Sequence, residues 1–208
     1  GGIVGVHGKI SHVIDGFYRA KESLFGKTLR GVGMTMEGSE NNPVMFELLT
    51  ELPWRPERFD KDEWLKSYTI ARYGKINSTV QDAWTLLSNS IYNCPPESTQ
   101  QGTHESLFCA RPSDHPYQVS SWSEMSDYYD PNDVIRAASM MVSVADQFIG
   151  NNNFEYDLVD IVRQAIAEKG RLVEKVVEAA FASGDKTLYN AAANKFLQLI
   201  LFQDELLG

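Results

Sequence analysis

The sequence has no long hydrophobic run and no excess of positive charge. None of its apolar stretches reaches the roughly 20 residues that a membrane-spanning helix needs, so we expect no membrane partner. Lys and Arg number 19 against 28 Asp and Glu, which gives a net charge of −9. Because proteins bind nucleic-acid phosphates through basic surfaces, we expect no nucleic acid as a partner either.

Cysteine is scarce as well. Cys94 and Cys109 are the only two, and His104 and His115 lie near them in the sequence. Their spacing lacks the close cysteine pair of structural zinc sites, so we expect no metal. A disulfide across the intervening loop fits an exported protein, and two unpaired thiols are the alternative. Glycine-rich phosphate loops, nucleotide motifs and a Ser-His-Asp order are also missing, so no cofactor is expected.

The first part of the chain reads as helix, strand, helix. Apolar residues at helical spacing predict a helix over 10–24, and a second helix is expected from Pro43 to about Leu52, with Asn42 as its N-cap. Between them, residues 29–36 predict a strand buried on both faces, with apolar residues that alternate or lie beside glycine. This unit resembles the end of a (β/α)8 barrel and cannot close one alone, because a barrel needs eight strands.

The rest of the chain reads as helices. We place the boundary at Pro53–Phe59 and expect two domains, residues 1–58 and residues 59–208. The second contains amphipathic stripes joined mostly by short links, which favours antiparallel helices with one shared core. The predicted fold class is therefore mainly α, a helical bundle preceded by a small α/β piece. The stripes are Trp64–Ala71, Val80–Ile91, Val134–Phe148, Leu158–Phe181 and Leu188–Ile200.

Glu37 is the first candidate for chemistry. It comes directly after the predicted strand, next to Gly38, and barrel enzymes keep catalytic residues at this end of their strands. A surface glutamate in a strand-to-helix turn is the common alternative. Glu40, three residues later, is better suited to the turn or to the N-terminus of the next helix.

Several segments resemble the glycoside hydrolase family 89 alpha-N-acetylglucosaminidases, with bacterial members the more similar. They are GVGMTMEGSENNPVMFELLTELPWR, RYG at 72–74, AWTLLSNSIYNC at 83–94, RPS at 111–113 and FEYDLVDIVRQAIAE at 154–168. The resemblance spans nearly the whole chain in order. One departure is Ile3, which follows Gly1 and Gly2 where the family has asparagine.

Enzymes of this family are several times longer than the 208 residues here, so we expect a fragment cut at both ends. The first residues do not read as a signal peptide, but a targeting signal would belong to the missing part. The resemblance implies an extracytoplasmic parent, either periplasmic or secreted.

The resemblance implies a retaining exo-glycosidase that hydrolyses terminal alpha-linked N-acetylglucosamine from glycans. Glu37 corresponds to the family's nucleophile. Retention needs a second carboxyl group about 5–5.5 Å away as acid/base, and this glutamate is expected outside the chain. The isolated fragment is therefore expected to be inactive. The alternative function is a helical structural or interaction module without activity of its own.

Aromatic residues and His7 offer further candidates. Trp64 and Trp84 lie within apolar stripes and are expected in the core, whereas Trp54, in the boundary turn, is a candidate for packing between the domains. Trp122 lies in a long polar loop and is the candidate substrate-binding residue. His7 reads as a structural histidine, the alternative being that it faces the catalytic end of the barrel.

The last helix is expected to expose an apolar face or to pair with another chain, because its partners would lie beyond Gly208. The residues expected on that face are Leu199, Ile200 and Phe202. The sequence therefore predicts either a contiguous exposed apolar patch or an oligomer contact at the last helix.

Overall fold

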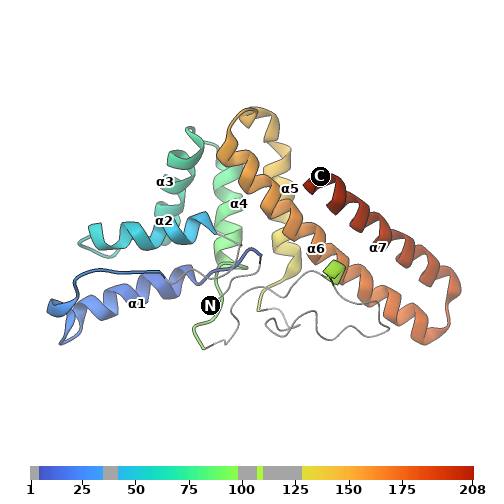
Figure 1. Ribbon diagram of the computed structural model, residues 1–208, viewed down its shortest axis with the longest axis horizontal. Coiled ribbons are helices and arrows are strands. Elements are labelled where there is room, and N and C mark those ends of the chain that lie inside the picture. The colour runs from blue at the N-terminus through green and yellow to red at the C-terminus, as the bar shows by residue number, and fades with distance from the viewer. Residues whose placement is uncertain (1–4, 35–41, 98–106, 110–127) are drawn as a thin grey trace.

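The computed structural model describes residues 5–34, 42–97, 107–109 and 128–208, and within these ranges the protein is built from α-helices. Figure 1 shows seven of them. They are α1 (Ile10–Glu22), α2 (Pro43–Glu51), α3 (Lys61–Tyr73), α4 (Ser78–Asn89), α5 (Pro131–Ser143), α6 (Asn152–Ser183) and α7 (Lys186–Leu207). The mainly α fold predicted from the sequence is confirmed. No described helix is both long and apolar enough to span a membrane.

Local sequence signals set the ends of most helices. Side-chain oxygens at five N-caps accept hydrogen bonds from backbone N–H groups of the first turn, which otherwise have no partner within the helix. Gly74 and Gly184 end α3 and α6 in the left-handed conformation, with φ of 75° and 72°, where a β-carbon is disfavoured. The five N-caps are Asp60, Asn77, Asp130, Asn151 and Asp185.

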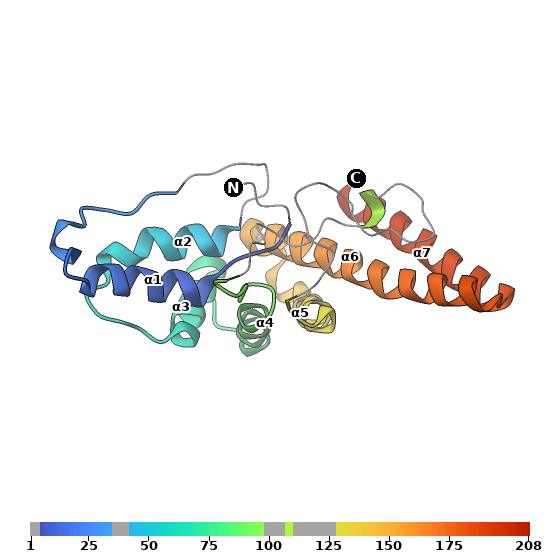
Figure 2. The ribbon, with the colours of Figure 1, turned by 90° about the horizontal axis from the view of Figure 1, so that it is seen from below.

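The helices form an elongated array. In Figures 1 and 2, α1 and α2 lie side by side at one end, α3, α4 and α5 follow, and α6 runs diagonally across the other end. Helix α6 has 32 residues and contacts α3, α5 and α7. Helix α7 returns antiparallel along most of α6 and is the outermost helix at this end of the array.

One hydrophobic core joins α1 to α6. It begins at Val6, includes buried residues of every helix from α1 to α5, and ends at Ala165 in α6. Trp64 and Trp84 are buried in it, which confirms the prediction for both. Helix α7 contributes no residue to this cluster, so the expectation of one core shared by all helices after Asp60 is wrong for α7. Helix α7 packs instead beside residues of α6 such as Leu172 and Val176, which lie outside this cluster.

The predicted strand at 29–36 is wrong for its described part, Leu29–Met34. These residues have irregular backbone, and the side chains of Leu29, Val32 and Met34 are 37–39% exposed. A barrel strand is buried only when strands pair with it on both sides and helices cover it. No strand is present among the described residues to pair with it, so its apolar side chains are left partly exposed.

Two further details differ from the sequence-based predictions. Trp54 is 84% exposed and does not pack between domains. Helix α5 ends at Ser143, and a 3-10 turn, Ala145–Phe148, replaces its expected continuation. In this turn Phe148 stacks on Phe154 of α6, with ring centroids 4.1 Å apart, so the chain bends to bring the two rings together.

Gly170 allows a close approach near the middle of α6. A β-carbon at this position would lie 2.8 Å from the ring of Phe108, which also packs edge-on against Phe196 of α7. Glycine in a helix interior costs up to about 1 kcal/mol relative to alanine. Here it makes room for a ring that joins α6 to α7.

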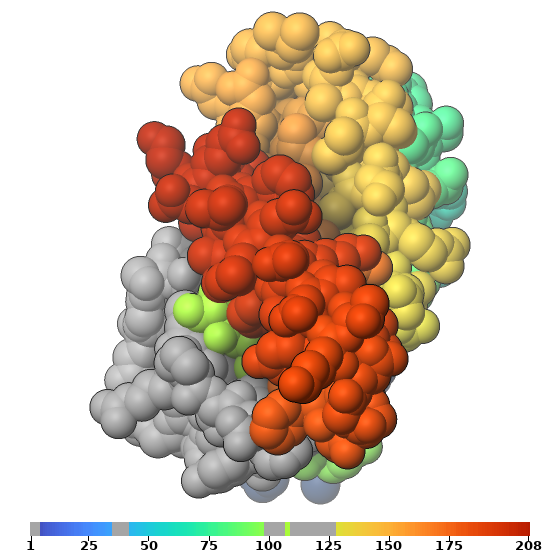
Figure 3. Space-filling model, turned by 90° about the vertical axis from the view of Figure 1, so that its right-hand side faces the viewer, coloured from blue at the N-terminus to red at the C-terminus, as the bar shows by residue number. Residues whose placement is uncertain are grey.

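The outer surface of α7 is strongly apolar. Figure 3 shows the face that α7 and the end of α6 form, with α5 beside them. Leu197, Leu201 and Phe202 are each more than half exposed, whereas Leu199 and Ile200 are partly buried. The prediction of an exposed apolar face is confirmed for Phe202. It is wrong for Leu199 and Ile200, whose side chains are only partly exposed.

Candidate functional site

The two site residues predicted from the sequence, Glu37 and Trp122, lie outside the described residues, and their roles stay predictions. The described residues that follow Glu37 and Trp122 most closely show where the two segments end. Asn42 comes five positions after Glu37, and Tyr128 comes six positions after Trp122. Both Asn42 and Tyr128 form a hydrogen bond with His7. The C-terminal ends of both candidate segments are therefore held at the same point.

Asn42 is the centre of this arrangement and is only 1% exposed. It occupies the N-cap position of α2 with Pro43 after it, as predicted, but its side chain does not cap the helix. Instead its Oδ1 accepts hydrogen bonds from the backbone N–H of His7 at 3.0 Å and from the Tyr92 hydroxyl at 2.9 Å. Its Nδ2 donates to the carbonyl of Gly5 at 3.3 Å. A side-chain cap typically stabilises a helix by about 1 kcal/mol. Asn42 gives up this stabilisation, because its side chain forms hydrogen bonds with residues distant in the sequence.

His7 is a buried, neutral histidine. Its Nδ1 lies 2.9 Å from the Tyr128 hydroxyl, which lies 2.5 Å from the carbonyl oxygen of Ile91. A carbonyl oxygen only accepts, so the Tyr128 hydroxyl donates to Ile91 and Nδ1 of His7 donates to Tyr128. Burial, aided by the charge of Lys9, lowers the pKa of His7 to about 4. These contacts support the structural role expected from the sequence.

Tyr92 is held rigidly on the other side of Asn42. It lies just after α4, is buried, and stacks on the indole of Trp84, with ring centroids 6.0 Å apart. Its backbone carbonyl accepts a hydrogen bond from the N–H of Ile10 at 3.0 Å. Burial raises the pKa of the Tyr92 hydroxyl well above its ordinary value, so the hydroxyl remains a hydrogen-bond donor. We call Gly5, His7, Asn42, Tyr92 and Tyr128 the His7 cluster.

A second layer of buried polar residues on α6 lies next to this cluster. Gln164 Oε1 accepts a hydrogen bond from the N–H of Val6 at 3.4 Å, and its Nε2 donates to Glu168 at 2.8 Å. Glu168 is fully buried and also accepts from the Tyr129 hydroxyl at 2.6 Å and from Arg171 at 3.4 Å. Its charge is therefore balanced by hydrogen bonds and by a buried cation, which a charge away from water requires.

Sequence reasoning missed this layer. The available signal was three polar residues at helical spacing, Gln164, Glu168 and Arg171, close to the apolar stripe of α6. Such residues are normally exposed. Only their contacts with the segment from Val6 and with Tyr129 show that they are buried.

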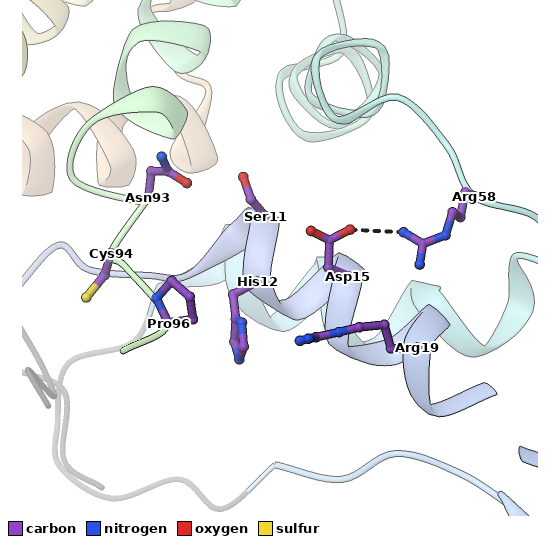
Figure 4. A pocket seen from close by; sticks show the side chains of 8 residues that line it. All are labelled: Ser11, His12, Asp15, Arg19, Arg58, Asn93, Cys94 and Pro96. Carbon is purple, nitrogen blue, oxygen red and sulfur yellow. Dashed lines mark hydrogen bonds and ion pairs between the residues drawn. The ribbon is translucent and has the colours of Figure 1, made fainter. Parts of the chain in front are cut away.

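A separate polar groove of about 300 Å³ lies on the outer side of α1. Figure 4 shows that an ion pair between Asp15 and Arg58, 2.9 Å long, crosses one side of it. No group of three metal-ligating side chains is found among the residues that the structure describes. His104 and His115 lie outside them, so the metal and cysteine predictions stay untested. The groove is lined by Ser11, His12, Asp15, Arg19, Arg58, Asn93, Cys94 and Pro96.

Comparison with solved structures identifies the class to which this fold belongs. The chain superposes on a family 89 glycoside hydrolase from Clostridium perfringens with a TM-score of 0.87 and 25% sequence identity. The superposition covers 98% of this chain and 23% of that enzyme. The same match is found for that enzyme in complex with PUGNAc and with 2-acetamido-1,2-dideoxynojirmycin.

Sequence comparison identifies the family. Residues 64–208 match the family model of the alpha-N-acetylglucosaminidase (NAGLU) C-terminal domain, and residues 1–56 match that of the NAGLU tim-barrel domain. The chain belongs to the alpha-N-acetylglucosaminidase family, as predicted. Human alpha-N-acetylglucosaminidase is 31% identical over 210 residues, a match that covers all of this chain and 27% of the human protein. The chain thus spans about a quarter of the length of these relatives.

The His7 cluster joins the two matched regions. Gly5, His7 and Asn42 fall within the tim-barrel match, whereas Tyr92 and Tyr128 fall within the C-terminal-domain match. The hydrophobic core also runs across residues 57–63, between the two matches. The regions are therefore connected both by buried hydrogen bonds and by apolar packing.

Proposed function

We propose that these residues are part of a retaining exo-glycosidase that hydrolyses terminal alpha-linked N-acetylglucosamine from glycans. The observation that carries this proposal is the match of both family models, in order, over nearly the whole chain. The Clostridium perfringens relative supports the substrate class, since it has been solved in complex with its substrate GlcNAc-alpha-1,4-galactose. In that structure two glutamates are replaced by glutamine, which fits a mechanism with two carboxyl groups.

We propose Glu37 as the nucleophile. In an alpha-linked 2-acetamido sugar the acetamide lies on the same face as the leaving group, so it cannot attack the anomeric carbon from the opposite face. An enzyme carboxylate must then form the covalent glycosyl intermediate. The second carboxyl group, supplied from outside this chain, first protonates the leaving oxygen and then activates the water that releases the sugar.

The remaining proposals concern the surroundings of Glu37. Trp122 is proposed to line the mouth of the site, where an indole can stack on the apolar face of a sugar. The division into a barrel piece, residues 1–58, and a helical domain, residues 59–208, remains our proposal for the domain organisation. The exposed apolar side of α7, with Leu197, Leu201 and Phe202, is proposed to contact a second copy of the chain.

The decisive experiment replaces Glu37 by alanine in the full-length protein that contains these residues. Cleavage of an aryl alpha-N-acetylglucosaminide with a good leaving group should fall by at least about a thousandfold in kcat, as expected for loss of a nucleophile. Added azide should restore turnover and yield the azido sugar, because a small anion can attack where the carboxylate stood. The matched control is Glu40→Ala, which alters a carboxylate of the same segment and should leave kcat within about threefold.

Circular dichroism of Glu37→Gln should match that of the unchanged protein, which separates loss of chemistry from loss of folding. If Glu37→Ala retained more than about a hundredth of the original kcat, the assignment would be wrong. Glu37 would then be a residue of the turn only.

A further inference from the structure

We propose that Tyr92 is a positioning residue for the proposed nucleophile Glu37 and that it acts through Asn42. This inference rests on the function proposed above and adds a role for a residue of the C-terminal-domain match. Tyr92 lies 55 positions after Glu37 in the sequence. Its hydroxyl donates a hydrogen bond, 2.9 Å long, to Oδ1 of Asn42, which follows Glu37 by five positions.

Asn42 is an anchored end point of the chain segment that precedes α2. It is buried, its carbonyl oxygen accepts from the first turn of α2, and its side chain is bonded to Gly5, His7 and Tyr92. Only four residues separate it from Glu37. Asn42 is therefore the described anchor that follows the proposed nucleophile most closely in the sequence.

The Asn42 side chain also has a competing use. An asparagine at an N-cap normally bonds to the free N–H groups of the first helical turn. The Tyr92 hydroxyl and the His7 N–H draw Oδ1 away from that position. Without the tyrosine hydroxyl one of these two bonds is lost, and the capping orientation of Asn42 becomes competitive.

Catalysis requires precise positioning. Catalytic groups must be held within about 0.5 Å of their productive position, and a displacement of about 1 Å can cost about a hundredfold in rate. Tyr92 is suited to maintain such precision because its ring is stacked on Trp84 and its carbonyl is bonded to Ile10. The hydroxyl thus connects the core of the helical region to the Glu37 segment.

The test is Tyr92→Phe in the full-length enzyme, assayed with the aryl alpha-N-acetylglucosaminide. This change removes one hydroxyl and retains the ring. We expect kcat to fall at least about tenfold while KM stays within about threefold, because the position of the nucleophile changes and sugar binding does not. The matched control is Tyr18→Phe, which removes another buried hydroxyl, 2.5 Å from the Glu57 carbonyl, and should leave kcat unchanged.

Azide rescue separates positioning of Glu37 from general damage. In a Glu37→Ala background the attacking azide is not attached to the segment that Asn42 anchors. Adding Tyr92→Phe to that background should therefore leave the rescued rate within about twofold. An equal fall of the rescued rate and of kcat would show a merely structural role and overturn the proposal.

A second variant keeps the proposal testable if Tyr92→Phe fails to fold. Asn42→Ser places a good capping residue at the start of α2 but is too short to keep the bonds to Tyr92 and Gly5. It should give the same selective fall in kcat. Unchanged kcat in either folded variant would overturn the proposal. The single variant Glu37→Ala tests the proposed function independently of Tyr92. If it retained activity, the proposed function itself would fail.

Discussion

The carboxylate of Asp157 on α6 accepts two hydrogen bonds from the guanidinium of Arg72 on α3, at 2.5 and 2.8 Å. It also accepts the hydroxyl proton of Tyr73 at 2.7 Å, and Asp157 is almost fully buried. Two helices that are distant in the sequence are therefore fixed to each other by one carboxylate. Asp157 lies in residues 154–168, a segment that resembles the family in sequence. In the structure this segment holds α3 and α6 together.

Replacing Asp157 by alanine should lower the free energy of unfolding by about 3–5 kcal/mol. The change leaves the Arg72 charge without its partner and the buried Tyr73 hydroxyl without its acceptor. Urea denaturation of the 208-residue chain measures the effect. The control is Asp160→Ala, one turn later on α6, which breaks only a partly exposed pair with Arg163 and should cost less than about 1 kcal/mol. Equal losses in the two variants would contradict this account.

His7 should make the stability of the chain depend on pH. Its pKa is lowered from 6.5 to about 4 in the folded state, so between these values the unfolded chain takes up a proton and the folded chain does not. Stability from this residue is present above pH 6.5 and is lost as pH falls to about 4, a total of about 3 kcal/mol. Denaturation of the unchanged protein and of His7→Asn at several pH values measures it.

His7→Asn retains an N–H donor near the position of Nδ1 but cannot titrate. The difference in unfolding free energy between the two proteins should therefore change by about 3 kcal/mol from pH 7 to pH 4. A difference that stays constant over this range would show that His7 does not become protonated on unfolding.

The exposed side of α7 should drive self-association of the 208-residue chain. Replacing Leu201 and Phe202 together by glutamate should shift the mass measured by analytical ultracentrifugation towards the monomer, because it removes apolar surface and adds charge. The matched control replaces two other exposed apolar residues, Ile76 and Ile149, by glutamate and adds the same charge. Identical masses for both double variants and the unchanged chain would refute a contact through α7.

The isolated 208 residues should not hydrolyse an aryl alpha-N-acetylglucosaminide. The mechanism needs a second carboxyl group, which we expect from a part of the enzyme outside this chain. The measurement compares release of the aryl group by the isolated chain, by its Glu37→Ala variant and by buffer. Turnover above buffer that disappears in the variant would show that an acid/base is present within these residues.

Local signals made the helices predictable. The N-caps at Asp60 and Asp185 and the glycine ends at Gly74 and Gly184 act within one turn of the chain, so they are visible in the sequence and are found in the structure. The family was also identifiable, because the segment around Glu37 is long and specific. The role of Glu37 stays a prediction from that resemblance.

Only the tertiary structure decided how the same residues are used. Asn42 has the sequence signature of a helix cap, yet its side chain bonds to His7 and Tyr92, because the folded chain brings these two distant donors within 3.0 Å of its Oδ1. Glu168 reads as a solvated charge and is fully buried. The sequence predicts residues 29–36 as a buried strand, but their described part, 29–34, is exposed, and no strand lies beside it among the described residues. Capping and periodicity depend on residues within about four positions, whereas burial and pairing depend on partners far along the chain.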